Sequence, residues 1–174
     1  MNRAVPRVLF HGYTAARGPR ESFRHTPSMR DRGGVGSQVT SPSFFFSASL
    51  EFAYKFALAK FDGDAPAVAA VQISVRRPLD LTAARAAVDE SLRSMGALGP
   101  REDLPSKREL WTILDEPRAV RAIVEDGYDS AVIDERDACD VLGVMDPAAR
   151  ISWAVFDRRH VVVLNPSVPI WTPP

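Results

Sequence analysis

Strand-like segments stand at both ends of this 174-residue chain, and helical patterns lie between them. Residues 5–10 and 151–156 are short apolar runs of the kind that forms buried strands. Between them apolar residues recur at helical spacing, as in Val88, Leu92 and Met95. The chain contains no internal repeat and no linker long enough to divide it. The pattern predicts one mixed α+β domain over residues 1–174.

The individual elements follow from periodicity and turn residues. Further strands are expected over 44–47, 67–75, 130–133 and 161–164. Helices are expected from Ser49, as N-cap, to Ala57, and over 82–95, 106–114 and 117–125. Gly12 is expected to end the first strand, and residues 134–150 to form an acidic loop.

Composition excludes several classes of function. Lys plus Arg and Asp plus Glu both number 22, so no net charge favours nucleic acid, although arginines cluster within 17–32. The single Cys139 excludes an internal disulfide, and no histidine has a partner at metal-ligand spacing, so no metal is expected. No apolar run has the length of a membrane span, so no membrane partner is expected and a cytoplasmic location is the default.

His11 and Gly12 follow the first apolar run. In isolation they are most often a turn with a satisfied imidazole. The functional alternative is that Gly12, which lacks a Cβ, lets a ligand approach the backbone so that its N–H and C=O clamp a carboxamide. The His11 imidazole could then bond a ribose hydroxyl.

The run Phe44-Phe45-Phe46 indicates a strand buried on both faces. Alternation places Phe45 opposite to its two neighbours, so its ring can line a binding site while theirs fill the core. The helix that follows directs Ala53 and Phe56 to one side, because they are three residues apart. Core packing is the ordinary alternative for the whole block.

Together, residues 8–13, 43–57 and 152–157 resemble the nicotinamide-binding cleft of the ADP-ribosyltransferases. The resemblance is to the branch related to diphtheria toxin and the poly(ADP-ribose) polymerases, and to its small phage and bacterial domains. It implies split antiparallel β-sheets with flanking helices, and NAD bound as a substrate. We expect the His11 imidazole and the Phe45 ring to border one slot for nicotinamide. The residues implied to bind NAD are His11, Gly12, Tyr13, Phe45, Ser47, Ala53 and Phe56.

The chain departs from this family at the catalytic glutamate, whose position is occupied by Ser152. The implied catalytic residues are therefore His11 and Ser152. A serine can keep a hydrogen bond to the ribose, but it supplies no negative charge. By alternation Asp157 points away from Ser152, and it is expected to cap a turn. The acidic residues of the late loop are interpreted as solvated, with action at the site as the less favoured alternative: Asp134, Glu135, Asp137 and Asp140.

The resemblance implies transfer of ADP-ribose from NAD to a macromolecular acceptor, with a protein favoured over a nucleic acid. Such a chain would be a toxin or effector, acting in the cytoplasm of its own cell or of a host. The alternative is a catalytically impaired module that binds NAD, ADP-ribose or a partner. A tRNA 2′-phosphotransferase shares this fold, but the neutral charge balance disfavours it.

Overall fold

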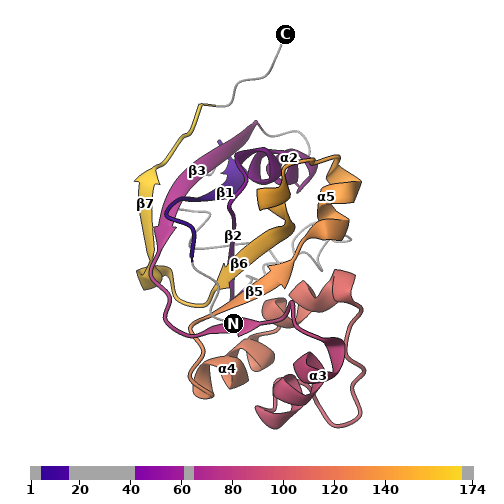
Figure 1. Cartoon of the computed structure of the whole chain (residues 1–174). Helices are drawn as coiled ribbons and strands as arrows, with labels where there is room; N and C mark the ends of the chain where they lie inside the picture. The colour runs from indigo at the N-terminus through magenta and orange to yellow at the C-terminus, as the bar shows by residue number, and fades with distance from the viewer. Residues whose placement is uncertain (1–4, 16–41, 61–64, 170–174) are drawn as a thin grey trace, which may run out of the picture.

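The computed structural model describes residues 5–15, 42–60 and 65–169, and Figure 1 shows its elements. It is a mixed α+β fold, as predicted. The strands are β1 (Leu9–Thr14), β2 (Phe44–Ser47), β3 (Pro66–Ile73), β4 (Pro78–Asp80), β5 (Ser130–Asp134), β6 (Ile151–Val155) and β7 (Val161–Asn165). The α-helices are α2 (Leu50–Lys60), α3 (Arg85–Ser94), α4 (Pro117–Glu125) and α5 (Arg136–Leu142). Shorter 3-10 helices are η2 (Lys107–Asp115), η3 (Pro147–Arg150) and η4 (Arg158–His160).

The strands form one open sheet in the order β4-β5-β6-β2-β1-β3-β7. Every neighbouring pair is antiparallel except β4 and β5. The pairing is weakest in the middle, where Phe10↔Ser47 is the single register position between β1 and β2. By contrast, β1 pairs with β3 over six positions and β2 pairs with β6 over four. The sheet therefore consists of two well-paired halves joined at one point.

Two apolar layers cover the two faces of the sheet. On one face, which we call the helix face, residues of α3, α4 and η2 pack against Phe45, Ala131 and Ala154. On the opposite face, Phe44 and Phe46 pack with Leu9, Tyr13 and Trp153. The expected alternation of the three phenylalanines is therefore confirmed. Figure 1 shows α3 and α4 together at the lower end of the molecule and α2 beside α5 at the upper right.

Helix α2 begins where the sequence predicts, because side chains turn the chain out of β2. Ser47 Oγ accepts a hydrogen bond from Ser49 N at 3.1 Å. Ser49 Oγ then accepts one from Phe52 N at 3.2 Å, which makes Ser49 the N-cap. Both serines are buried, so these bonds satisfy polar groups that water does not reach.

Three expectations about elements are wrong. Gly12 does not end the first strand, since β1 runs on to Thr14 and is paired with β3 along its whole length. Pro78 begins the short strand β4, parallel to β5, where no strand was expected. Residues 134–150 are not a loop, because they contain α5 and η3. Helix α5 has seven residues and a single buried one, Cys139, so its sequence carries little helical periodicity.

Candidate functional site

The most distinctive local geometry is the place where β1 and β2 separate. Ala15 N donates to Ala65 O at 2.9 Å, one step beyond the pair Thr14↔Pro66. In an antiparallel ladder the hydrogen-bonded pairs alternate, so Tyr13 and His11 bond to β3, whereas Gly12 turns its N–H and C=O away from it. The carbonyl of Val68, the β3 partner of Gly12, indeed faces outward and accepts from Val168 N at 2.8 Å.

The backbone edge of Gly12 therefore faces β2, beyond the last paired position. If the ladder continued past Phe10↔Ser47, Gly12 would stand opposite Phe45. Instead, the carbonyl of Phe45 accepts a hydrogen bond from His11 Nδ1 at 2.9 Å. The imidazole takes the acceptor that the Gly12 N–H would have used. At the interruption a side-chain hydrogen bond therefore stands in place of a ladder hydrogen bond.

This hydrogen bond also determines the state of the His11 ring. A carbonyl can only accept, so Nδ1 carries the proton, and in the neutral ring Nε2 is the acceptor nitrogen. Burial lowers the pKa of His11 from 6.5 to about 4, against the bond to Phe45, which raises it. The side chain is 6% exposed. At neutral pH the ring is uncharged, in one tautomer.

Gly12 is required for a reason that the sequence did not suggest. A Cβ at this position would lie 2.1 Å from Ala53 O and 3.0 Å from Ala57 Cβ, both in α2. The missing side chain lets α2 pack directly onto β1 and does not open the backbone to a ligand from that side. A ligand can contact Gly12 through its backbone N–H and C=O, which lie in the plane of the sheet.

The predicted aromatic residues are distributed over different layers. The Phe45 ring packs at the edge of the helix-face cluster, whereas the His11 ring lies against Phe46, with centroids 5.5 Å apart. His11 thus bonds to the backbone carbonyl of Phe45 and packs against the ring of Phe46. The expectation that the His11 imidazole and the Phe45 ring border one slot is wrong, because the two rings lie on opposite faces of the sheet. Phe56 stacks on Phe52 at 6.0 Å and packs against α5. Tyr13 lies in the opposite-face core, where its hydroxyl donates to the carbonyl of Pro166.

Ser152 lies in a polar row that crosses the sheet. It is paired with Ser47 on one side and with Ile133 on the other. Ser47 is in turn paired with Phe10, next to His11. Both serines are buried and lie on the helix face by alternation. Strand register therefore places Ser152 two strands away from the Gly12 edge.

The residue that sequence analysis undervalued is Glu135, at the end of β5. The sequence pattern suggests a solvated side chain, but Glu135 is partly buried, and Ser152 lies close enough to its carboxylate to affect its pKa. The pKa of Glu135 is raised from 4.5 to about 7, mainly by burial; the neighbouring Ser152 lowers it and the charge of Asp134 raises it. Glu135 lies two residues after Ile133, on the same face. Its neighbour across the sheet cannot be deduced from the sequence alone, because it depends on the strand register.

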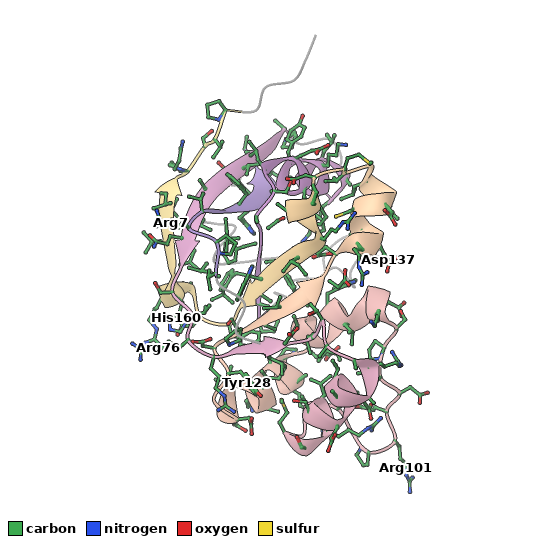
Figure 2. All side chains as sticks on the ribbon, viewed as in Figure 1. Arg7, Arg76, Arg101, Tyr128, Asp137 and His160 are labelled. Atoms are coloured by element: carbon green, nitrogen blue, oxygen red, sulfur yellow. The ribbon has the colours of Figure 1, made fainter. Side chains whose placement is uncertain are left out.

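Other acidic residues have local partners. Asp134 forms an ion pair with Arg136, and Asp157 accepts from Arg159 N at 2.8 Å, which confirms that it caps the turn. Asp137 lies on α5, and Arg76 and Arg101 extend away from the molecule (Figure 2). The arginine cluster at 17–32, His25 and the glycines at 33–36 lie outside the described residues.

In the part of the chain that the structure describes, no group of three or more His, Cys, Asp or Glu side chains is placed to hold a metal ion. None of the helices described has both the length and the apolar character needed to cross a bilayer.

Comparisons with protein-family models, curated protein sequences and solved structures found no match.

Proposed function

We propose that this protein is an NAD-dependent ADP-ribosyltransferase that binds NAD where β1 and β2 separate. The observation that carries the proposal is the backbone edge of Gly12, which faces the interruption in the ladder. A primary carboxamide presents an acceptor oxygen and an N–H donor side by side, as a strand edge does. The nicotinamide amide can therefore pair with Gly12 in place of the missing β2 backbone.

His11 supports the same assignment. Its neutral ring is held at the interruption by the bond to the Phe45 carbonyl, and in this proposal the ring contacts a ribose hydroxyl. Phe45 and Phe56 are only partly buried, and in this proposal their rings cover the flat nicotinamide from the side of the sheet opposite to His11. The remaining predicted ligand residues hold the surrounding elements in place: Tyr13, Ser47 and Ala53.

The two halves of the sheet support a finer statement of the fold. We assign β4-β5-β6-β2 and β1-β3-β7 to the split antiparallel sheets of the ADP-ribosyltransferase-like family. The single paired position between β1 and β2 is consistent with such a split. The single, buried Cys139 suits a reducing compartment, so we place the activity in a cytoplasm, with a protein as the acceptor.

The second candidate function is a module that binds NAD or ADP-ribose without turnover. Ser152 favours it, because a serine stands where the family has its catalytic glutamate. A hydroxyl does not provide the negative charge that stabilises an oxocarbenium-like transition state. Binding and release of nicotinamide must therefore be measured separately.

Calorimetric titration with NAD, with chromatographic measurement of free nicotinamide in the same samples, separates the two functions. A transferase binds NAD and releases nicotinamide; a binding module binds NAD and leaves it intact over many hours. Absence of NAD binding by the folded protein would exclude both.

A ligand pair tests the Gly12 edge itself. Nicotinamide can donate an N–H to the Gly12 carbonyl, whereas nicotinic acid presents a carboxylate that cannot donate and is repelled. We expect nicotinic acid to bind at least about tenfold more weakly, since a hydrogen bond plus an unfavourable contact is worth more than about 1.4 kcal/mol. Equal affinities for the two ligands would contradict the assignment.

The variant His11→Ala tests the imidazole. We expect NAD affinity to fall by about tenfold, because one hydrogen bond of about 1 kcal/mol and the tautomer that supplies it are lost. His160→Ala is the matched control, since His160 belongs to η4, outside the proposed site. An unchanged affinity in folded His11→Ala would remove His11 from the site.

A further inference from the structure

Ser152 is accompanied by a carboxylate that comes from the neighbouring strand. The register pairs Ser152 with Ile133, and the chain continues two residues from Ile133 to Glu135. Alternation along β5 returns Glu135 to the face on which Ser152 lies. Ser152 lies close enough to the Glu135 carboxylate to lower its pKa, which agrees with this placement. Ser152, which stands where the resembling family has its catalytic glutamate, thus has a glutamate directly beside it.

The backbone of Glu135 is held on both sides. Its N–H donates to Arg150 O at 2.8 Å, and its carbonyl accepts from Cys139 N at 2.8 Å, at the start of α5. These bonds fix the point from which the side chain starts, and its partial burial limits its rotamers, which suits a group that must meet a reacting atom.

The charges around Glu135 leave its carboxylate without a cation. Asp134 is paired with Arg136, so that guanidinium is already engaged by another carboxylate. Lys55, on the adjacent α2, pairs with Glu51 at 2.9 Å and donates to Gly143 O at 2.8 Å. In the part of the chain that the structure describes, no ion pair of Glu135 is present. A partly buried carboxylate of this kind is stabilised by any positive charge that forms beside it.

We propose that Glu135 supplies the carboxylate of the transfer reaction, in place of the glutamate that Ser152 has replaced. This inference rests on the proposed function. Glu135 holds the 2′-hydroxyl of the nicotinamide-side ribose and stabilises the positive charge on the sugar as the C1′–N1 bond breaks. The bonding electron pair leaves with nicotinamide, which becomes neutral. An acceptor lone pair then bonds to C1′, and the proton of the acceptor passes to solvent.

In this arrangement Ser152 is a positioning residue. In this proposal its hydroxyl lies beside the Glu135 carboxylate and orients it, while the serine itself carries no charge that could stabilise the ribose. Ser47, paired with Ser152 on the other side, keeps the row polar between Glu135 and β1.

The test measures nicotinamide release and NAD affinity for wild type, Glu135→Gln and Asp140→Asn. The glutamine is close in size and removes only the charge, so release should fall by about a hundredfold, as for other lost electrostatic groups in active sites. NAD affinity should change by less than about threefold, because the charge acts in the transition state. Asp140→Asn, an exposed neighbour on α5, should match wild type.

A charge-transplant variant gives an independent readout. Ser152→Glu combined with Glu135→Gln moves the carboxylate to the adjacent strand and should recover at least about tenfold of the lost rate. Ser152→Glu alone places two carboxylates side by side and should not exceed wild type, because like charges raise the pKa of both.

The pH profile distinguishes a reacting carboxylate from a structural one. The groups facing Glu135 are Asp134, Cys139 and Ser152, with Arg150 on η3 nearby. The wild-type rate should rise through about pH 7, where the carboxylate ionises, and this rise should be absent in Glu135→Gln.

The outcomes distinguish failure of the proposed function from failure of the role assigned to Glu135. If wild type releases no nicotinamide, the proposed function fails and this inference fails with it. If wild type is active and Glu135→Gln is equally active, Glu135 is excluded while the transferase stands. If Glu135→Gln does not fold, Glu135→Asp is measured instead; it keeps the negative charge on a side chain that is shorter by one methylene group. Loss of NAD affinity in step with the rate in these variants would assign Glu135 a structural role and overturn the inference.

Discussion

His11 and Glu135 illustrate how burial acts on single residues of opposite charge type. Removal from water disfavours the charged form of each, so the pKa of the histidine falls to about 4 and that of the glutamate rises to about 7. Both groups are therefore neutral in weakly acidic solution. At neutral pH the glutamate begins to ionise, whereas the histidine stays uncharged.

These shifts have opposite effects on the pH dependence of stability. Below pH 6.5 the unfolded chain protonates His11 and the folded chain does so only near pH 4, so the His11 contribution to stability rises with pH across this window. Glu135 ionises near pH 4.5 when unfolded and near pH 7 when folded, so its contribution falls over that window. Each amounts to on the order of 3 kcal/mol, at 1.36 kcal/mol per pKa unit.

We therefore predict that the free energy of unfolding of wild type changes little between pH 4.5 and pH 6.5, because the two contributions cancel. In Glu135→Gln the His11 contribution remains alone, and stability should rise by on the order of 3 kcal/mol over this range. Urea unfolding at the two pH values measures both. A Glu135→Gln protein with the same pH dependence as wild type would show that Glu135 titrates normally in the fold.

At the scale of elements, the contact of α2 with β1 organises the proposed site. Helix α2 lies so close to the strand that the backbone of Ala53 occupies the space of a Gly12 side chain. The same helix carries Phe56, and its first turn is bonded to Ser47 and Ser49. Moving α2 would therefore shift the walls of the site together.

Gly12→Ala should be strongly destabilising. The new methyl group would lie 2.1 Å from a backbone oxygen, which cannot move without displacing α2. We expect a loss of about 3 kcal/mol or more in urea unfolding, at the upper end of overpacking effects. Gly99→Ala is the matched control, because its Cβ would meet the flexible Glu102 side chain at 3.0 Å; its cost should stay below about 1 kcal/mol. Similar losses in the two variants would contradict the close packing of α2.

The elements differ in how well their sequences predict them. Strand β2 and helices α2, α3 and α4 were predicted because their apolar residues recur with a clear period or follow a cap. Helix α5 was missed, since a seven-residue segment with one buried side chain has no such period. Gly12 was expected to break β1, but pairing with β3 along the whole strand overrides the low strand propensity of glycine.

For the whole molecule, the open sheet leaves an apolar edge. In the described sheet β7 is a terminal strand, and Val162, Val163 and Leu164 are 53%, 39% and 50% exposed. An edge strand of this kind presents both unpaired backbone groups and apolar side chains to other molecules. Figure 1 shows β7 at the left side of the molecule, away from α2 and α5.

We predict that Leu164→Lys lowers concentration-dependent association, measured by light scattering, while unfolding free energy changes by less than about 0.5 kcal/mol. Leu58→Lys is the matched control: Leu58 is equally exposed, at 53%, but lies in α2, whose backbone is internally bonded. If both variants reduce association equally, apolar exposure alone drives it and the strand edge is not involved.

The sequence by itself determined the mixed α+β class, most strands and helices, and that Phe45 faces opposite to Phe44 and Phe46. These properties depend on the periodicity of neighbouring residues, and that periodicity is visible in each segment separately. Only the tertiary structure decided that the Gly12 edge faces an interruption in the ladder and that Glu135 meets Ser152. Both depend on the register of strands distant in sequence, and a slip of one residue would turn every side chain to the other face. The register cannot be deduced from any single segment, because packing against the other strands determines it.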